Sequence, residues 1–303
     1  MSDRSRRRFL HTVATAALAM HAPLSFAETP PLRRAIPRDG RTVPAVGLGT
    51  WQAFDYADDP AADRDALATL RLVAAAGGVI DSSPMYGRSE AVAGRLLRKA
   101  DPARAAFVAT KVWTRGKAAG RAQIDESMRL LGRDPIDLMQ VHNLVDLDTH
   151  LATLADLKTA GRVRYVGITH YTASAHADLV RAIERGGLDF VQVNYSLRER
   201  DAARTVFPAA RANGVAVLVN RPFAEGDVFR ATKGKPLPDF AREIGAASWA
   251  QYALKFILGE PAVTCAIPGT RNPKHCADNL GTASGPPPDA ALRRRMAEHF
   301  DTL

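Results

Sequence analysis

The sequence predicts an α/β fold of the (β/α)8 TIM-barrel type with a short N-terminal hairpin. Short apolar segments recur eight times along the chain, and stretches with helical spacing separate them. These segments are apolar on both faces, as parallel strands covered by helices should be. Eight strand–helix units in about 250 residues match such a barrel in count and size. The predicted strands are 45–48, 78–80, 106–109, 136–141, 163–168, 190–193, 215–219 and 263–267.

The remaining elements follow from local patterns. Residues 36–43 predict a hairpin around Asp39-Gly40, a dipeptide typical of tight turns. Helical spacing is clearest at 62–76, where two leucines and a valine form one apolar stripe, and at 147–159, where three leucines form another. Glycines follow most predicted helices, as expected at helix ends. They are Gly77, Gly132, Gly161, Gly186, Gly214 and Gly259.

A doubly wound open sheet is the alternative fold. Such a sheet normally carries a three-glycine dinucleotide fingerprint between its first strand and first helix. Residues 47–52, Gly-Leu-Gly-Thr-Trp-Gln, supply two glycines, lack the third, and precede no predicted helix. The dinucleotide fingerprint therefore fails, and the barrel is the better prediction.

Composition narrows the function classes. The chain is 46% hydrophobic and 24% charged, and no apolar run reaches the roughly 20 residues of a membrane span, so we expect no stable membrane insertion. Its net charge of +9 comes partly from residues 1–27 and is otherwise scattered, with one tight cluster at 293–295, so we expect no nucleic-acid partner.

Two cysteines, Cys265 and Cys276, exclude a disulfide framework and a four-cysteine zinc site; we expect no metal. Whether these two bond depends on geometry that sequence does not supply.

Residues 1–27 have the pattern of a twin-arginine signal peptide. Ser5-Arg6-Arg7-Arg8-Phe9-Leu10 precedes the apolar stretch 13–20, and Ser25-Phe26-Ala27 has the small-x-small form of a cleavage site. A basic tail followed by an amphipathic helix fits worse, because 13–20 has no polar face. We therefore expect a signal at 1–27, a barrel domain at 28–303, the twin-arginine export machinery as a partner, and a periplasmic location.

Polar side chains follow three consecutive predicted strands. Asp81 follows 78–80, Lys111 follows 106–109, His142 follows 136–141, and Tyr86 lies in the loop after Asp81. In a barrel the carboxyl ends of the strands meet at one rim, where functional sites lie. Taken singly, Asp81 and Lys111 could be a structural ion pair and Tyr86 a packing residue. Together they predict a site.

These four residue types suit a proton donor. A phenol with a pKa near about 10 is a poor acid at neutral pH, and a nearby ammonium lowers that pKa. Asp81 would keep Lys111 charged and oriented, while His142 would hydrogen-bond a carbonyl oxygen near Tyr86. Such a site protonates an oxygen that gains negative charge. It holds no hydride, so a reduction needs a cofactor.

At these residues the sequence resembles the aldo/keto reductase family over nearly all of 28–303. The family's motifs stand here as Val-Gly-Leu-Gly-Thr-Trp at 46–51, Ile-Asp-Ser-Ser-Pro-Met-Tyr-Gly at 80–87, Thr-Lys-Val-Trp at 110–113 and Ile-Asp-Leu-Met-Gln-Val-His at 136–142. The resemblance implies a (β/α)8 barrel, NADPH bound without a Rossmann domain, and a substrate pocket flanked by Trp51 and Trp113, for which core packing is the alternative. It also implies a catalytic tetrad of Asp81, Tyr86, Lys111 and His142.

The resemblance also implies cofactor contacts. Residues 267–279 look like the family's phosphate-binding turn into a helix, whose first N–H groups favour an anion. Cationic side chains in this turn favour NADP over NAD, with a surface cluster as the alternative. Gln192 would lie near the nicotinamide carboxamide and Asn279 near the adenine. The predicted contacts in the turn are Gly269, Thr270, Arg271 and Lys274.

The sequence departs from the family pattern at two places. Thr169-His170 stands where members often have Ser-Asn, and Asn220-Arg221 stands where many have an aromatic residue that stacks on the nicotinamide. Arg221 could instead reach a phosphate. All four residues are predicted cofactor contacts.

The sequence therefore predicts a periplasmic NADP-dependent oxidoreductase that reduces small aldehydes or ketones to alcohols, with Tyr86 as general acid. An alternative is an exported dinucleotide-binding protein that senses redox state or serves a partner without steady turnover. Free NADPH is not expected outside the cytoplasmic membrane, which keeps this alternative open. Multiple turnover with added NADPH distinguishes the two.

Overall fold

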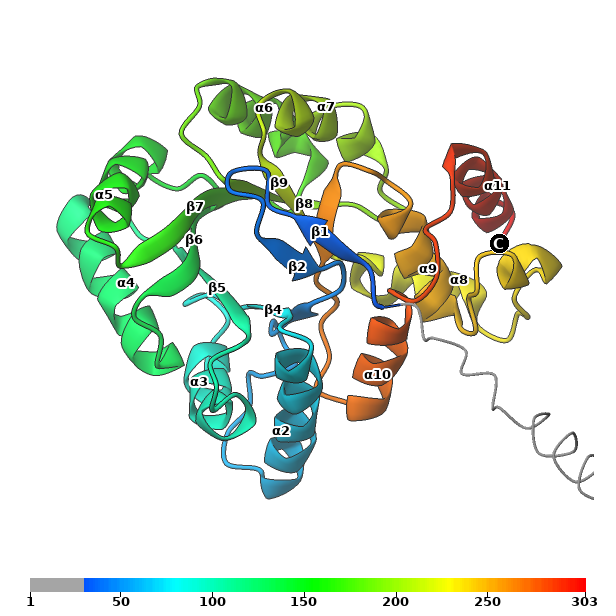
Figure 1. The fold of residues 1–303 in the computed structure, drawn as a ribbon, viewed down its shortest axis with the longest axis horizontal. Coiled ribbons are helices and arrows are strands. Elements are labelled where there is room, and N and C mark those ends of the chain that lie inside the picture. The colour runs from blue at the N-terminus through cyan, green and yellow to red at the C-terminus, as the bar shows by residue number, and fades with distance from the viewer. Residues whose placement is uncertain (1–29) are drawn as a thin grey trace, which may run out of the picture. The chain divides into compact units, whose positions relative to one another are not determined.

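Eight parallel strands form a nearly closed barrel in the computed structural model, which describes residues 30–303 (Figure 1). The predicted signal at 1–27 lies outside the described residues. Neighbours along the chain are neighbours in the sheet, from β3 to β10, and the bridges Val46–Ala266 and Gly49–Gly269 join its two edges. The strands are β3 (Leu48–Gly49), β4 (Val79–Asp81), β5 (Phe107–Val112), β6 (Ile136–His142), β7 (Val163–Thr169), β8 (Phe190–Asn194), β9 (Ala216–Asn220) and β10 (Val263–Ala266).

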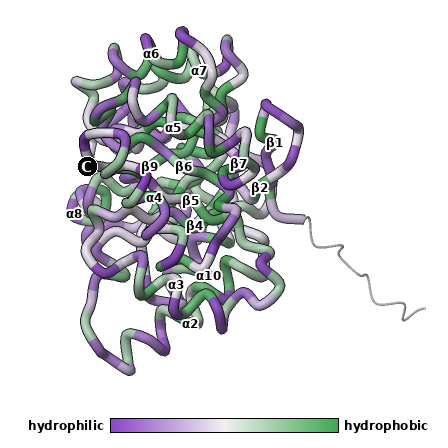
Figure 2. Tube along the Cα trace, turned by 90° about the vertical axis from the view of Figure 1, so that its left-hand side faces the viewer, coloured by the Kyte–Doolittle hydropathy of each residue, from purple (hydrophilic) through white to green (hydrophobic). Residues whose placement is uncertain are grey.

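Helices surround the strands, and the apolar segments lie mainly inside this ring (Figures 1 and 2). The predicted helix 62–76 is α2, which begins two residues earlier because Asp59 accepts hydrogen bonds from the N–H groups of Ala61 and Ala62. None of the helices in residues 30–303 is both long and apolar enough to span a membrane. They are α2 (Pro60–Ala75), α3 (Ser89–Ala100), α4 (Lys117–Leu131), α5 (Leu147–Thr159), α6 (His176–Glu184), α7 (Val206–Ala212), α8 (Asp227–Thr232), α9 (Trp249–Leu258), α10 (Pro273–Gly281) and α11 (Ala290–Asp301).

The N-terminal hairpin covers one end of the barrel. It pairs β1 (Arg33–Ala35) with β2 (Thr42–Pro44). The hairpin was predicted at 36–43, but its first strand lies before this range, and residues 36–41 form the connection between the two strands. Ile36 and Val43 are buried in the same apolar cluster as the barrel interior. The Tyr165 hydroxyl of β7 donates to Asp39 Oδ2 at 2.6 Å. These contacts close the amino-terminal end of the barrel.

Side chains inside the barrel alternate along each strand, as the two-residue period of a strand requires. Apolar residues fill the layer above the hairpin and include Phe107, Leu138, Tyr165, Phe190 and Leu218. Polar side chains follow at the carboxyl ends of these and neighbouring strands. They are Asp81, Lys111, Gln140, Thr169, Gln192 and Asn220. The apolar layer thus leaves the polar layer open at one end only.

Two sequence features receive a structural explanation. Cys265 and Cys276 are both free and buried, so no disulfide joins them. A Cβ on Gly47 would lie 2.6 Å from the Val79 carbonyl oxygen. The glycine before β3 therefore allows the backbone of β4 to approach it closely.

Candidate active site

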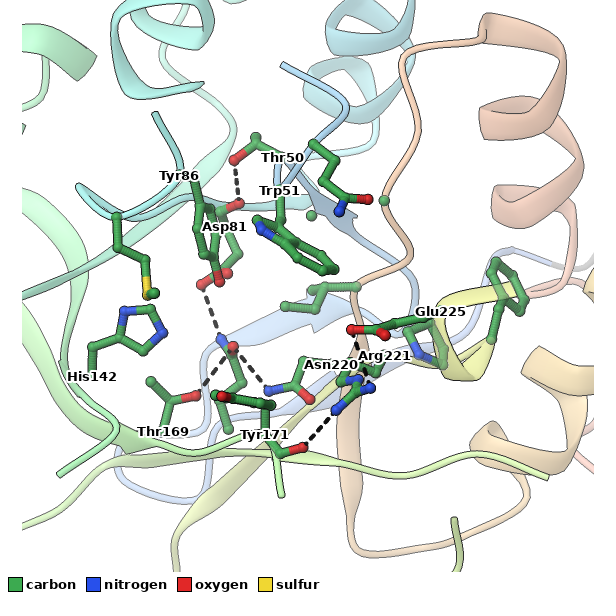
Figure 3. Close-up of a pocket in the computed structure, with 18 of the residues that line it drawn as sticks. Thr50, Trp51, Asp81, Tyr86, His142, Thr169, Tyr171, Asn220, Arg221 and Glu225 are labelled. Carbon is green, nitrogen blue, oxygen red and sulfur yellow. Dashed lines mark hydrogen bonds and ion pairs between the residues drawn. The ribbon is translucent and has the colours of Figure 1, made fainter. Parts of the chain in front are cut away.

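The carboxyl ends of the strands open into a cavity of about 530 Å³. Loops after β3, β4, β6, β7 and β9 form much of its wall (Figure 3). Nine predicted site residues line it: Trp51, Asp81, Tyr86, His142, Thr169, Gln192, Asn220, Arg221 and Gly269. The other predicted residues lie beneath it or beyond its wall: Lys111, Trp113, His170, Thr270, Arg271, Lys274 and Asn279.

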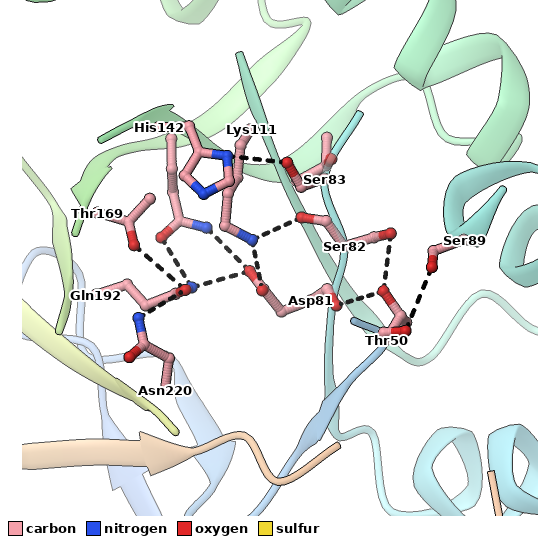
Figure 4. A network of polar contacts seen from close by, with 12 residues as sticks. Thr50, Asp81, Ser82, Ser83, Ser89, Lys111, His142, Thr169, Gln192 and Asn220 are labelled. Atoms are coloured by element: carbon pink, nitrogen blue, oxygen red, sulfur yellow. Dashed lines mark hydrogen bonds and ion pairs between the residues drawn. The ribbon is translucent and has the colours of Figure 1, made fainter. Parts of the chain in front are cut away.

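A buried ion pair lies at the base of the cavity. The Lys111 ammonium is 2.6 Å from Asp81 Oδ2 and also donates to the Ser82 carbonyl oxygen at 2.7 Å (Figure 4). Lys111 is fully buried and Asp81 is nearly so. Burial lowers the pKa of Lys111, but the Asp81 carboxylate and the Tyr86 phenol raise it above its ordinary value overall. The lysine therefore stays charged in the interior.

Tyr86 lies between this ion pair and the cavity. The loop after β4 turns through a hydrogen bond from the Tyr86 N–H to the Ser83 carbonyl oxygen at 3.0 Å. The Lys111 ammonium lies 4.8 Å from the centre of the phenol ring. Burial raises the pKa of Tyr86, and Lys111 opposes that rise without overcoming it. The structure thus differs from the expected net lowering, because sequence does not show how deeply the phenol is buried.

His142 packs against Tyr86 and completes the cluster with Asp81 and Lys111. Its ring lies edge-on to Tyr86 with 5.9 Å between centroids, and its Nδ1 lies 3.0 Å from the Ser83 hydroxyl. Burial, with Lys111 and His170 adding to it, lowers the pKa of His142 to about 2. The ring is therefore neutral. If the Ser83 hydroxyl donates to Nδ1, the Nε2–H remains as a donor toward the cavity.

A chain of amide side chains extends the polar layer around Asp81. Gln140 and Gln192 each donate from Nε2 to Asp81 Oδ1 at 3.0 Å. Gln140 was not among the residues predicted from the sequence. The signal was present, because Gln140 stands between Leu138 and His142 at the two-residue spacing of one strand face.

Several buried polar atoms on the cavity wall have no partner among the described residues. They are Asn143 Oδ1, Asn220 Oδ1 and Arg221 Nε, and all three residues line the cavity. Buried polar atoms normally find hydrogen-bond partners. The wall therefore fits a ligand that carries amide or phosphate groups, as a nicotinamide dinucleotide does.

Arg221 and His170, one residue from each place where the sequence departs from the family pattern, differ in where their side chains lie. Arg221 lines the cavity and joins two loops: its guanidinium donates to the Tyr171 carbonyl oxygen at 3.0 Å and lies 3.1 Å from Glu225 (Figure 3). His170 instead turns back to its own loop, where Nδ1 accepts from the Tyr171 N–H at 3.0 Å. Its ring stacks on Tyr171 and does not line the cavity. His170 is thus tied to the local backbone.

The predicted phosphate-binding turn continues from the cavity wall at Gly269 into α10. Asn272 caps this helix by accepting from the Lys274 N–H at 2.9 Å, and the Thr270 hydroxyl accepts from the Asn272 N–H at 3.1 Å. The Arg271 guanidinium lies 5.6 Å from the centre of the Tyr56 ring. Arg271 and Lys274 therefore stand at a helix start, where an anion is favoured. Asn279 is buried within α10.

The two tryptophans stand at the rim. Trp51 lines the cavity and is 44% exposed, which argues against simple core packing. Trp113 is 41% exposed, and its ring centroid lies 6.5 Å from that of His142, although it lies outside the cavity lining. Met85, Tyr171 and Phe229 are further exposed apolar residues on the cavity wall. The opening is thus apolar around a polar base.

Comparisons with known proteins agree with this geometry. The sequence profile of the Aldo/keto reductase family matches residues 45–290. The chain is 28% identical to "Aldo-keto reductase YhdN" of Bacillus subtilis over 60% of its length and 59% of that protein's. It is 29% identical to "NADH-specific methylglyoxal reductase" of Escherichia coli over 61% of its length and 65% of that protein's. The chain therefore spans less than two thirds of either relative.

Solved structures share the barrel. An aldo/keto reductase from Klebsiella pneumoniae in complex with NADP and acetate matches with a TM-score of 0.72 and 23% identity, covering 86% of this chain and 93% of that one. The glycerol dehydrogenase AKR11B4 from Gluconobacter oxydans matches with a TM-score of 0.71 and 22% identity, covering 88% and 94%. At these identities the likeness establishes the fold.

Proposed function

Because this chain belongs to the aldo/keto reductase family, we propose that it is an NAD(P)H-dependent reductase that converts small aldehydes or ketones to alcohols. One observation carries the proposal: a fully buried ammonium, Lys111, lies between Asp81 and the phenol ring of Tyr86 at the base of an open cavity. A buried charge is costly unless it is paired. Its presence beside a phenol suits a site that handles a proton.

Each residue of the group then has a role. Neutral His142 donates a hydrogen bond to the substrate carbonyl oxygen and orients it toward Tyr86. Tyr86 gives its proton to that oxygen as negative charge develops. Lys111 stabilises the phenolate that remains, and Asp81 holds Lys111 in place. The raised pKa of Tyr86 keeps the phenol protonated before the reaction.

We propose NADPH as the cofactor, which would supply the hydride when bound. The unpartnered atoms of Asn143, Asn220 and Arg221 would hold its polar groups on the cavity wall. Arg271 and Lys274 would bind the additional phosphate of NADP at the start of α10. The Klebsiella structure is an NADP complex, whereas the Escherichia coli relative is described as NADH-specific. The cofactor preference therefore rests on this chain's own cations.

The cavity rim supports an uncharged carbonyl substrate. Trp51 and Met85 present apolar surface beside Tyr86, and the one guanidinium on the described wall, that of Arg221, is paired with Glu225. Apolar walls with few polar groups are typical of small-molecule sites. The wall therefore suits a small uncharged carbonyl compound.

Export is a separate part of the proposal. We propose that residues 1–27 direct the folded protein to the periplasm by the twin-arginine route, on the strength of the Ser-Arg-Arg-Arg-Phe-Leu pattern at 5–10. This route carries folded proteins, which suits a barrel that encloses a cofactor.

The direct test is NADPH consumption with a panel of aldehydes, ketones and quinones. A reductase oxidises many equivalents of NADPH per protein with at least one carbonyl compound. Oxidation of one equivalent followed by a stop would instead favour a dinucleotide-binding redox sensor or partner protein, and would overturn the proposed activity.

A further inference from the structure

We propose that Gln140 and Gln192 are positioning residues for the reaction, and that they hold the Asp81 carboxylate so that Lys111 stays directed toward Tyr86. The inference rests on the proposed function, because it assigns a task to two residues of the same site. Neither glutamine is expected to touch the reacting atoms.

The two oxygens of Asp81 have separate partners. Oδ1 accepts from Gln140 and from Gln192, each at 3.0 Å, while Oδ2 accepts from Lys111 at 2.6 Å. All four side chains are at most 2% exposed. The carboxylate therefore cannot turn both oxygens toward the ammonium without giving up two amide hydrogen bonds.

The amide groups are themselves oriented by neighbours. Gln192 Oε1 accepts from the Thr169 hydroxyl and from Asn220 Nδ2, each at 3.3 Å (Figure 4). Gln192 Nε2 also lies 3.2 Å from Gln140 Oε1. These contacts assign the Nε2 atom of Gln192 to the side that faces Asp81, since a flipped amide would oppose two donors. The network thus links the cavity wall to the ion pair.

This arrangement has a consequence for Tyr86. Burial is the main reason that the pKa of Tyr86 is raised; Lys111 lowers this pKa and Asp81 raises it, so the position of the ammonium between them matters. Amide donors stabilise a carboxylate without adding a charge that competes with Lys111. Without them, Asp81 can turn toward Lys111 and draw the ammonium away from the phenol. Tyr86 then becomes a weaker acid.

The test uses isosteric variants without an amide donor, Gln140→Met and Gln192→Met. Each should lower kcat about tenfold at saturating NADPH. In Gln140→Met the KM and the NADPH affinity should stay within about twofold, whereas Gln192→Met should also weaken NADPH binding, because Gln192 lines the cavity and is a predicted cofactor contact. The matched control is Gln251→Met, because Gln251 Nε2 donates to another carboxylate, Asp278 Oδ1, at 2.7 Å outside this site. That control should keep kcat.

A third variant adds a pH-dependent readout. Gln140→Glu places a second carboxyl beside Asp81, and two close carboxylates cannot both be charged without cost. Protonated Glu donates as the amide does, so activity should recover toward the wild-type value at low pH and fall as pH rises. The titratable groups around this position are Asp81 on β4, Lys111 on β5, His142 on β6, Cys265 on β10 and Tyr86 in its loop. The variant keeps all of these residues, so the dependence of wild-type activity on pH serves as the reference.

A measurement without turnover separates this inference from the proposed function. Carbon-13 NMR of labelled tyrosine, with Tyr86→Phe to assign the signal, should show Tyr86 ionising at higher pH in Gln140→Met and Gln192→Met than in wild type and Gln251→Met. An unchanged Tyr86 titration, or a lower melting temperature with kcat per folded molecule preserved, would overturn the positioning role. If the wild-type protein reduces no carbonyl compound, the proposed function is overturned. The Tyr86 titration measured by NMR then still decides whether the two glutamines have the positioning role.

Discussion

The ammonium of Lys111 lies 4.8 Å from the centre of the Tyr86 ring and has no exposure to solvent. The same ammonium is 2.6 Å from the Asp81 carboxylate. This places a permanent charge directly behind the one phenol that reaches from the β4 loop into the cavity.

Replacing Lys111 by Met should remove carbonyl reduction and also destabilise the fold. Breaking a buried pair leaves Asp81 uncompensated, which typically costs about 3–5 kcal/mol of unfolding free energy. Adding Asp81→Asn should restore part of the stability and none of the activity. Urea denaturation and turnover on the same preparations measure both effects. Restored activity in the double variant would contradict the role of the ammonium.

The charge state of His142 predicts a pH dependence of stability. Burial, then Lys111 and His170, lower its pKa from 6.5 to about 2 in the folded chain. Between these values the unfolded chain binds the additional proton, so the stability of the fold rises with pH in this range and falls on acidification. The slope from this group is at most about 1.4 kcal/mol per pH unit. Denaturation of wild type and His142→Asn between pH 4.5 and 7 should show a shallower slope in the variant; equal slopes would mean that His142 titrates normally.

Cofactor choice is tested at the start of α10. Arg271→Ala combined with Lys274→Ala should weaken NADPH binding and leave NADH binding nearly unchanged. Each lost charge-assisted hydrogen bond is worth roughly 1.5–3 kcal/mol, less where solvent screens it. Cofactor fluorescence titrations measure both affinities. If they fall together, this segment does not read the additional phosphate.

Export is tested by replacing Arg6 and Arg7 with Lys. The protein should stay folded and active but remain in the cytoplasm, because in the proposed signal the arginine pair would act only as a receptor-read address. Fractionation with cytoplasmic and periplasmic markers measures the distribution. An equal periplasmic yield from the variant would show that residues 1–27 do not act as a twin-arginine signal.

Strand order and the grouping of Asp81, Tyr86, Lys111 and His142 were predictable because both follow from local pattern. Apolar runs located all eight strands, yet seven of the predicted ends stopped one to three residues short, in most cases where the side chains turn polar. The eighth prediction, 263–267, instead ran one residue past the end of β10 at Ala266. Lys111 and His142 were expected after their strands and lie within β5 and β6. The polar layer continues the same two-residue alternation as the apolar one, and this alternation would have revealed Gln140.

Other features depend on contacts that no local pattern contains. His170 turns away from the cavity because the backbone of its own loop offers it two N–H groups, those of Tyr171 and Thr172. The pKa of Tyr86 is raised because the folded chain buries the phenol. The depth of burial and the direction of a side chain at a loop are set by tertiary packing, so they appear only in the structure.

The central claim is that Tyr86 donates the proton, and Tyr86→Phe tests it most directly. The substitution keeps the ring that packs against His142 and removes only the hydroxyl. A positioned general acid contributes about 10²–10⁴ in rate. We predict that kcat for aldehyde reduction falls by that factor, while NADPH affinity stays within a few fold and the melting temperature is preserved. A Tyr86→Phe protein that reduces aldehydes at nearly the wild-type rate would contradict the account.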